Sequence, residues 1–286
     1  MTALRVGVVG VGAMGMGAAK ALLAKGFTVF VRDIVAAREE EAVAAGAKPL
    51  SGDVDVLVSL VIDARETRAV VEEHGSRAPA FMMCSTIAPG DVERFAAALN
   101  ACDVEMLDAP ISGGPARAHA GTLSMMAAGS DAAFERCRPV IEAMSAKCFR
   151  LGAKPGDGSR MKVVNNMMAA ANIVAACEAM AMAAKLGIDL DRAMAVVNAS
   201  SGASWMFADR MPRALAGDYA PTAAARVLLK DVGLFVDVAR SFGLSAPMAE
   251  QAQAVFRDVC ERGFAEEDDA AVLKRYADEW KVEVPR

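Results

Sequence analysis

The sequence predicts an α/β protein with a doubly wound parallel sheet in its first half and an all-helical second half. Two observations predict this. Residues 5–108 alternate short apolar runs with amphipathic stretches, which is the rhythm of βαβ units. Residues 161–264 show helical periodicity and no convincing strand. With 286 residues the chain is long enough for two domains, which we place at 1–157 and 158–286.

Individual elements follow from apolar runs, turn residues and glycines. We expect strands at residues 5–9, 28–31, 54–61, 80–84 and 105–108, and helices at 14–25, 34–45, 65–71 and 91–100. In the second half, glycines at positions 187, 202, 217 and 243 separate helices, and the last helix ends near Trp280. The acidic segment at residues 266–269 is read as a short turn without a catalytic role.

Charge and cysteine usage exclude several classes of function. The net charge is −5, and lysines and arginines are spread along the chain, so no nucleic-acid partner is expected. The six cysteines form no C-x-x-C pair, which argues against a zinc site and against a disulfide framework. His74 and His119 have no carboxylate partner in sequence, so we expect no metal site and no histidine chemistry. Reduced thiols indicate a cytoplasmic protein.

The apolar segments of the sequence do not indicate a membrane or secreted protein. The apolar start resembles a signal peptide superficially, but its glycines are spaced for a turn followed by a helix. Between Lys162 and Glu178 lie 15 uncharged residues that include three asparagines, which is short and polar for a membrane span. A buried helix of a soluble protein is the preferred interpretation.

The first strand is followed directly by a dinucleotide-binding pattern. Gly10, Val11, Gly12, Ala13, Met14 and Gly15 form a G-x-G-x-x-G turn that opens a helix, where a pyrophosphate meets backbone N–H groups. Asp33 ends the second strand about 20 residues later, where a carboxylate binds the ribose 2′-hydroxyl. The first domain is therefore predicted to be of the Rossmann type. Asp33 favours NAD over NADP, although Arg32 leaves NADP open as the less favoured cofactor.

Three further motifs follow in order. They are Asp-Ala-Pro-Ile-Ser-Gly-Gly at 108–114, Gly-Asp-Gly-Ser-Arg-Met-Lys-Val-Val-Asn-Asn at 156–166, and Lys-Asp at 230–231. Together with the glycine turn, they resemble the β-hydroxyacid dehydrogenase family, which includes 3-hydroxyisobutyrate dehydrogenase, tartronate semialdehyde reductase and L-threonate dehydrogenase. The resemblance spans nearly the whole chain. It implies an NAD-dependent oxidation of the hydroxyl of a small hydroxycarboxylate.

The resemblance also implies roles for single residues. Ser112, Gly113 and Gly114 would bind the substrate carboxylate, Lys162 would be the catalytic acid/base, and Asn166 would hold the substrate. Thr86 and Lys230 would contact the cofactor, with Lys230 near the nicotinamide.

The residues themselves agree with these roles. Lys162 and Asn166 are four apart on a predicted helix and therefore face the same side. A lysine beside a nicotinamide cation in a partly desolvated cleft has its pKa lowered, which suits a base. Interpretations without a role in binding or catalysis remain open. Asn165 competes with Asn166 as the residue that holds the substrate. Ser112 to Gly114 also fit a turn without a ligand, and Lys230 also fits a solvated helix lysine.

The sequence gives broader expectations for the substrate branch and for the quaternary structure. Residues 200–207, 217–221 and 267–269 resemble the L-threonate branch, whereas Asn165 and Asn166 are similar to the 3-hydroxyisobutyrate and tartronate semialdehyde enzymes. An imine reductase-like enzyme and a non-catalytic NAD-sensing protein are the alternatives. The long, Ala-rich helix that begins near Met161 predicts a homodimer or homotetramer.

Overall fold

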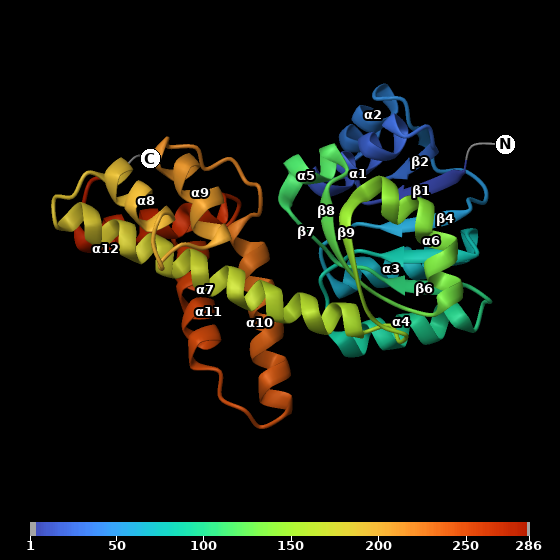
Figure 1. Cartoon of the computed structure of the whole chain (residues 1–286). Coiled ribbons are helices and arrows are strands. Elements are labelled where there is room, and N and C mark those ends of the chain that lie inside the picture. Colours follow the sequence, from blue (N-terminus) through green and yellow to red (C-terminus); the bar gives the residue numbers. More distant parts are fainter. Residues whose placement is uncertain (1–3, 285–286) are drawn as a thin grey trace. The chain divides into compact units, whose positions relative to one another are not determined.

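The chain, in a computed structural model that describes residues 4–284, folds into two compact units (Figure 1). Unit 1 is Met1–Lys162 and unit 2 is Val163–Arg286. Residues 1–3 and 285–286, which our two domain ranges include, lie outside the described residues. The expected boundary after residue 157 and the unit boundary after Lys162 both fall in the first turns of helix α7 (Asp157–Lys185).

Unit 1 is built on one sheet, which has nine strands in the described part of the chain. The strands are β1 (Arg5–Val9), β2 (Thr28–Arg32), β3 (Lys48–Pro49), β4 (Val56–Ser59), β5 (Ala80–Met83), β6 (Glu105–Asp108), β7 (Ile111–Ser112), β8 (Leu123–Ala128) and β9 (Ser145–Gly152). Their order is β3-β2-β1-β4-β5-β6-β8-β7, with β9 paired to β8. Strands β1 to β6 are parallel, which confirms the predicted Rossmann-type sheet.

Helices cover both faces of this sheet because its strands are apolar on both sides. They are α1 (Ala13–Ala24), α2 (Ala36–Ala44), α3 (Ala64–His74), α4 (Pro89–Asn100), α5 (Gly114–Ala120) and α6 (Asp131–Met144). Successive residues of β5 face opposite cores: Met82 packs in the core formed with α1 and α6, and Phe81 in the core formed with α3 and α4. Asp63 begins α3 as its N-cap, because its carboxylate accepts a hydrogen bond from Glu66 N.

The far edge of the sheet was not expected from the sequence. Strand β8 is antiparallel to both β6 and β7, and β9 then runs parallel to β8. The sequence of β8, Leu-Ser-Met-Met-Ala-Ala, consists largely of residues that favour helices. Strand β9 is mostly exposed and lacks the apolar alternation that identifies a strand, so its pairing with β8 decides its conformation.

Unit 2 is helical throughout its described residues, apart from an isolated bridge between Ala224 and Asp268. Besides most of α7, it contains α8 (Leu190–Asn198), α9 (Trp205–Leu215), α10 (Ala225–Ser241), α11 (Pro247–Val259) and α12 (Val272–Trp280). The predicted breaks at Gly187, Gly217 and Gly243 fall between helices, and all three glycines have positive φ. The last helix ends at Trp280, as expected.

Helix α7 is, by length and composition, apolar enough to cross a membrane. A helix buried in the core of a protein passes the same test, and the middle of α7 is buried in this way. Ala170, Ile173, Cys177 and Ala181 are all fully buried in the core of unit 2. The packing of unit 2 therefore explains the apolar residues on the buried side of this helix.

An ionic cluster is buried beside this core. Arg210 of α9 donates from Nε to Asp269 Oδ1 at 2.8 Å, and Asp268 Oδ2 accepts from the Thr222 hydroxyl at 2.6 Å. Burial raises the pKa of Asp269 to about 7, and the neighbouring Arg210 opposes that rise. The acidic turn at residues 266–269 thus contributes two buried carboxylates: Arg210 pairs with Asp269, and both Arg210 and Arg213 lie close to Asp268.

We predict that Arg210→Met destabilises unit 2 by about 3–5 kcal/mol, because it leaves the buried Asp269 without its counter-charge. Arg226→Met is the matched control in the same unit: Arg226 forms an exposed pair with Glu266, so its loss should cost less than about 1 kcal/mol. Urea unfolding followed by tryptophan fluorescence measures both, since the two tryptophans, Trp205 and Trp280, lie in unit 2. Equal stability of the two variants would contradict a structural role for the cluster.

Candidate functional site

The glycine turn between β1 and α1 has the geometry that its first and last glycines require. Gly10 has φ +87°, and a Cβ there would lie 2.7 Å from the carbonyl oxygen of Leu60, which follows β4. A Cβ on Gly15 would lie 1.8 Å from the carbonyl oxygen of Gly10. The fold itself therefore demands glycine at both positions, because the turn folds back on itself and against the neighbouring strand.

Gly12 differs, because nothing in the fold demands glycine there. Its φ of −64° and ψ of −168° are open to any residue, and a Cβ would meet no atom nearer than Arg38 Nη1 at 4.0 Å. The space in front of Gly12 is free for a ligand. It lies between β1 and β4, where the strand order reverses and dinucleotides bind in such sheets. The turn thus fits the close approach of a pyrophosphate.

Asp33, directly after β2, is held against this turn. Its carboxylate is 6% exposed and accepts from Val11 N at 2.7 Å and from Val35 N at 2.8 Å. A carboxylate has further lone pairs for ribose hydroxyls, so these bonds fix it without saturating it. Arg32 is paired with Glu39, which also accepts from Asp33 N. This pairing directs the one guanidinium next to Asp33 to a carboxylate and favours NAD.

Two buried hydroxyls mark the same edge of the sheet. The side-chain oxygens of Ser59 and Ser85, after or at the ends of β4 and β5, have no hydrogen-bond partner among the described residues. Thr86, the predicted cofactor contact, is the next residue in the chain. Sequence reasoning missed both serines, although each stands where a parallel strand ends and ligands bind. Unsatisfied buried hydroxyls at this edge fit a polar ligand.

A small cavity adjoins the glycine turn. It has a volume of about 260 Å³, and its lining includes Gly12, Ala13, Lys20, Arg38 and His119. His119 therefore lies beside the turn, as a residue of α5. Among the described residues, no group of three histidine, cysteine, aspartate or glutamate side chains is placed to hold a metal ion.

The predicted carboxylate-binding segment follows β7. Ser112 ends that strand, and Gly113 and Gly114 have φ values of +134° and +74°, which favour glycine. A Cβ on Gly113 would also lie 2.7 Å from Arg117 Cδ, whereas one on Gly114 would meet open space. The backbone of Gly113 and Gly114 carries no side chain, so the N–H groups of this segment are open to an anionic ligand.

Lys162 and Asn166 lie one turn apart on α7, as predicted. In unit 2, Asn166 donates from Nδ2 to Asp231 Oδ2 at 2.6 Å, and Lys230 Nζ lies 2.5 Å from Asp231 Oδ1. Asp231 is buried, and it joins Asn166 of α7 to Lys230 of α10. Sequence reasoning gave Asp231 no role, because its partner is 65 residues away in the chain.

The competition between the two asparagines is also informative. Asn166 is buried, whereas Asn165 is partly exposed and donates from Nδ2 to Asn166 Oδ1 at 3.1 Å. The side chain of Asn166 is therefore oriented from two sides. This arrangement favours Asn166 as the residue that presents a fixed amide.

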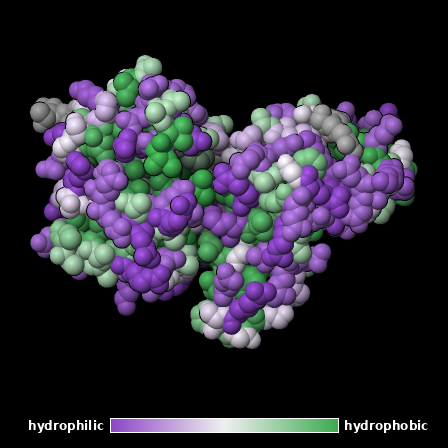
Figure 2. All heavy atoms as spheres, turned by 180° about the vertical axis from the view of Figure 1, so that it is seen from behind, coloured by the Kyte–Doolittle hydropathy of each residue, from purple (hydrophilic) through white to green (hydrophobic). Residues whose placement is uncertain are grey.

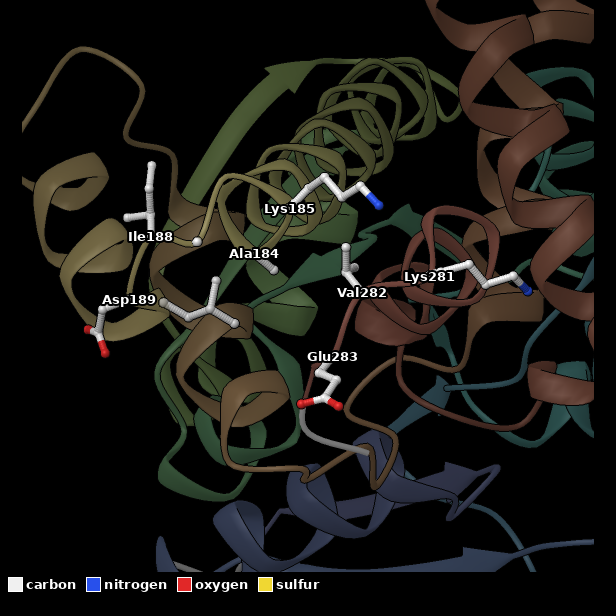
Figure 3. A pocket seen from close by; sticks show the side chains of 9 residues that line it. Ala184, Lys185, Ile188, Asp189, Lys281, Val282 and Glu283 are labelled. Carbon is white, nitrogen blue, oxygen red and sulfur yellow. The ribbon is translucent and has the colours of Figure 1, made fainter.

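A wider cavity of about 610 Å³ lies elsewhere in unit 2, at the opposite end of α7 (Figure 3). Its lining includes Lys185, Ile188, Asp189, Val282 and Glu283, and it contains none of the predicted site residues. The cavity carries no cluster of converging polar groups: in the close-up, the acidic and basic side chains point in different directions. Cavity size alone therefore does not identify the site.

The turn at Gly10 to Gly15, Asp33 and the reversal of strand order define an NAD-binding protein of the Rossmann type. Two family models match the chain. Residues 5–152 match the NAD-binding domain of 6-phosphogluconate dehydrogenase, and residues 156–276 match the model described as NAD-binding of NADP-dependent 3-hydroxyisobutyrate dehydrogenase.

Individual relatives agree with these models. L-threonate dehydrogenase of Escherichia coli is 40% identical over 285 residues, which cover 95% of this chain and 94% of that one. A solved structure of 3-hydroxyisobutyrate dehydrogenase from Salmonella typhimurium is 39% identical, with a TM-score of 0.90 over 95% of this chain and 99% of that one. The chain therefore belongs to the 3-hydroxyisobutyrate dehydrogenase-like family of NAD-dependent hydroxyacid dehydrogenases.

The imine reductase alternative is much more distant. An imine reductase from Pseudomonas is 20% identical, with a TM-score of 0.63 over 96% of this chain and 99% of that one, so it shares the fold alone. The chain is an oxidoreductase that acts on hydroxyl groups with NAD, as the resemblance of its motifs predicted.

We predict that Gly12→Ala leaves the melting temperature within about 2 °C of the wild type but weakens NAD binding about tenfold or more, since the new methyl group occupies free space in front of the turn. Gly15→Ala is the contrasting variant and should lower the melting temperature, because its Cβ collides with the Gly10 carbonyl. Calorimetric titration with NAD and thermal melts distinguish them. Tight NAD binding by Gly12→Ala would show that the pyrophosphate lies elsewhere.

Proposed function

We propose that this enzyme oxidises a hydroxycarboxylate of the L-threonate type, with Lys162 as acid/base and Asn166 as substrate-holding residue. The observation that carries the proposal is the arrangement on α7, where Lys162 precedes by one turn an asparagine that Asp231 fixes from α10. The 40% identity to L-threonate dehydrogenase supports the choice of substrate. So does the segment Ser200 to Phe207, whose sequence resembles the L-threonate branch.

Each side chain then has a defined task. Oxidation of an alcohol removes a hydride from carbon and a proton from oxygen, and NAD, when bound, accepts the hydride. Lys162 takes the hydroxyl proton on Nζ. Asn166 holds the substrate through its oriented amide, and the backbone N–H groups of Ser112, Gly113 and Gly114 bind the carboxylate.

The cofactor contacts form a second set. Gly10, Val11, Gly12, Ala13, Met14 and Gly15 cradle the pyrophosphate, Asp33 binds the ribose, and Thr86 and Lys230 contact the remainder. Lys230 is tied to Asp231, so its ammonium group is held in place before any ligand arrives. A positioned lysine of this kind keeps its charge close to a fixed point, which suits a residue next to a cofactor.

The decisive assay measures NADH formation at 340 nm with L-threonate, 3-hydroxyisobutyrate, D-glycerate, L-serine and 4-hydroxybutyrate as candidate substrates. We expect turnover of L-threonate with NAD, and a loss of about a hundredfold or more in kcat for Lys162→Ala, because the proton then has no acceptor.

Lys154→Ala is the matched control, as Lys154 is an exposed lysine just before α7. It should retain wild-type turnover. NAD binding without turnover of any acid, or an unimpaired Lys162→Ala, would overturn the proposal and favour a non-catalytic NAD sensor.

We also propose that a second copy of the chain covers one side of α7. An exposed apolar stripe whose members are three, four or seven residues apart, as along a helix seam, runs along it: Val164, Met168, Ala175, Ala179, Met182 and, just past its end, Leu186. At 1.5 Å per residue the stripe is about 33 Å long. Its length and self-complementary apolar character suit a twofold interface between identical helices. A homodimer or homotetramer follows.

The variant Met168→Glu tests this interface. A charge on the stripe should shift the protein toward monomer in light scattering, because each partner would bury an unpaired carboxylate. Ile34→Glu is the control, since Ile34 is 90% exposed and belongs to unit 1, outside the apolar stripe of α7. A wild-type protein that is monomeric at micromolar concentration would contradict the proposal.

The chemistry of the thiols supports a cytoplasmic location, which we propose for the enzyme. All six cysteines are free, and burial raises the pKa of the Cys137 thiol to about 12. Free thiols are typical of a reducing compartment. On the face shown in Figure 2, hydrophilic side chains are spread over the surface, in keeping with the absence of a basic block in the sequence.

A further inference from the structure

The carboxylate of Asp108 binds the beginning of α7. Asp108 is the last residue of β6 and is fully buried. Its Oδ2 accepts from Gly156 N at 2.8 Å and from Ser159 N at 2.9 Å, and its Oδ1 accepts from the Ser159 hydroxyl at 2.8 Å. These donors flank Asp157, the first residue of the helix. Asp108 thus performs from a distant strand the task that an N-cap side chain performs locally.

Close packing reinforces this attachment. A Cβ on Gly158 would lie 2.4 Å from the carbonyl oxygen of Met126 in β8 and 2.9 Å from that of Asp108. At Gly158 the first turn of α7 therefore lies directly on the backbone of β6 and β8, without a side chain between them. Burial raises the pKa of Asp108, and the hydrogen bonds from Ser159 and Gly156 oppose that rise. A carboxylate is also the favoured charge at a helix N-terminus.

This attachment joins two segments of the proposed site. Lys162 follows Ser159 by three residues, so it lies one turn beyond the residue that Asp108 holds. Ser112 follows Asp108 itself by four residues. The proposed carboxylate-binding segment thus follows Asp108 closely in the chain. The helix that carries the proposed acid/base is hydrogen-bonded to the side chain of the same residue.

We propose that Asp108 is a positioning residue of the dehydrogenase reaction, which holds the first turn of α7, and with it Lys162, in register with the segment Ser112 to Gly114. The proposal rests on the proposed role of Lys162. A misplacement of about 1 Å in a reacting group costs about a hundredfold in rate. Loss of this attachment therefore slows the chemical step more than it weakens ligand binding.

The test compares Asp108→Asn and the milder Ser159→Ala with the wild type, using L-threonate and NAD. We expect kcat to fall about a hundredfold for Asp108→Asn and about tenfold for Ser159→Ala, with KM and the Kd for NAD within about threefold. Hydrogen–deuterium exchange supplies a readout without turnover: amides of residues 156–162 should exchange about tenfold faster in both variants.

Asp189→Asn is the matched control. Asp189 caps α8, where its Oδ1 accepts from Arg192 N at 2.9 Å, so the same change from aspartate to asparagine is made at the cap of a different helix. It should keep the wild-type kcat. If Asp108→Asn does not fold, Ser159→Ala decides the question.

Two results would overturn the proposal while Lys162→Ala has a reduced kcat. The folded Asp108 and Ser159 variants could keep the wild-type kcat, or they could change only in KM or in the Kd for NAD. An unimpaired Lys162→Ala would instead refute the proposed function, and the exchange rates would still show whether Asp108 holds the helix.

Discussion

Helix α7 is the element on which the arrangement of the proposed catalytic residues depends. Because it is continuous from Asp157 to Lys185, the spacing of Lys162 and Asn166 is set by the helix itself rather than by a flexible linker. Its first turn is held by Asp108 and Gly158 in unit 1, and its middle forms part of the core of unit 2. One helix therefore has to satisfy two different packing environments. The apolar residues on its buried side are the consequence.

The sequence was sufficient for those parts of the fold where local pattern and tertiary position agree. Strands β1, β2, β4, β5 and β6 are apolar runs followed by turn residues, and each lies close to its predicted range. Strands β8 and β9 could not be predicted, because their pairing with each other outweighs the helical preference of one and the polar surface of the other. Their neighbours α5 and α6 were missed with them, since no element was assigned to residues 115–151 from the sequence.

The proposed site likewise contains residues that the sequence alone could place and residues that it could not. The glycine turn and Asp33 follow a spacing within one βαβ unit, so sequence alone could place them together. Asp108 and Asp231 could not be assigned in this way, because their partners lie 48 to 65 residues away and depend on the folded topology. Gly12 and Gly15 belong to the same motif, yet the structure shows that they are required for different reasons. Gly12 leaves room for a ligand, whereas Gly15 is demanded by the backbone of the turn.

Three buried aspartates share one function in this molecule, since each holds a segment of the proposed site. Asp33 accepts from Val11 of the glycine turn, Asp108 accepts from the first turn of α7, and Asp231 accepts from Asn166. Burial of a carboxylate costs stability unless hydrogen bonds compensate for the lost water, and each of these carboxylates is compensated by at least two donors. An apolar residue would satisfy the core at lower cost but would leave the bound segment free to move. At these three positions the buried charge therefore fixes a backbone segment or an amide that the proposed chemistry requires, whereas the buried cluster of Arg210, Asp268 and Asp269 has a structural role.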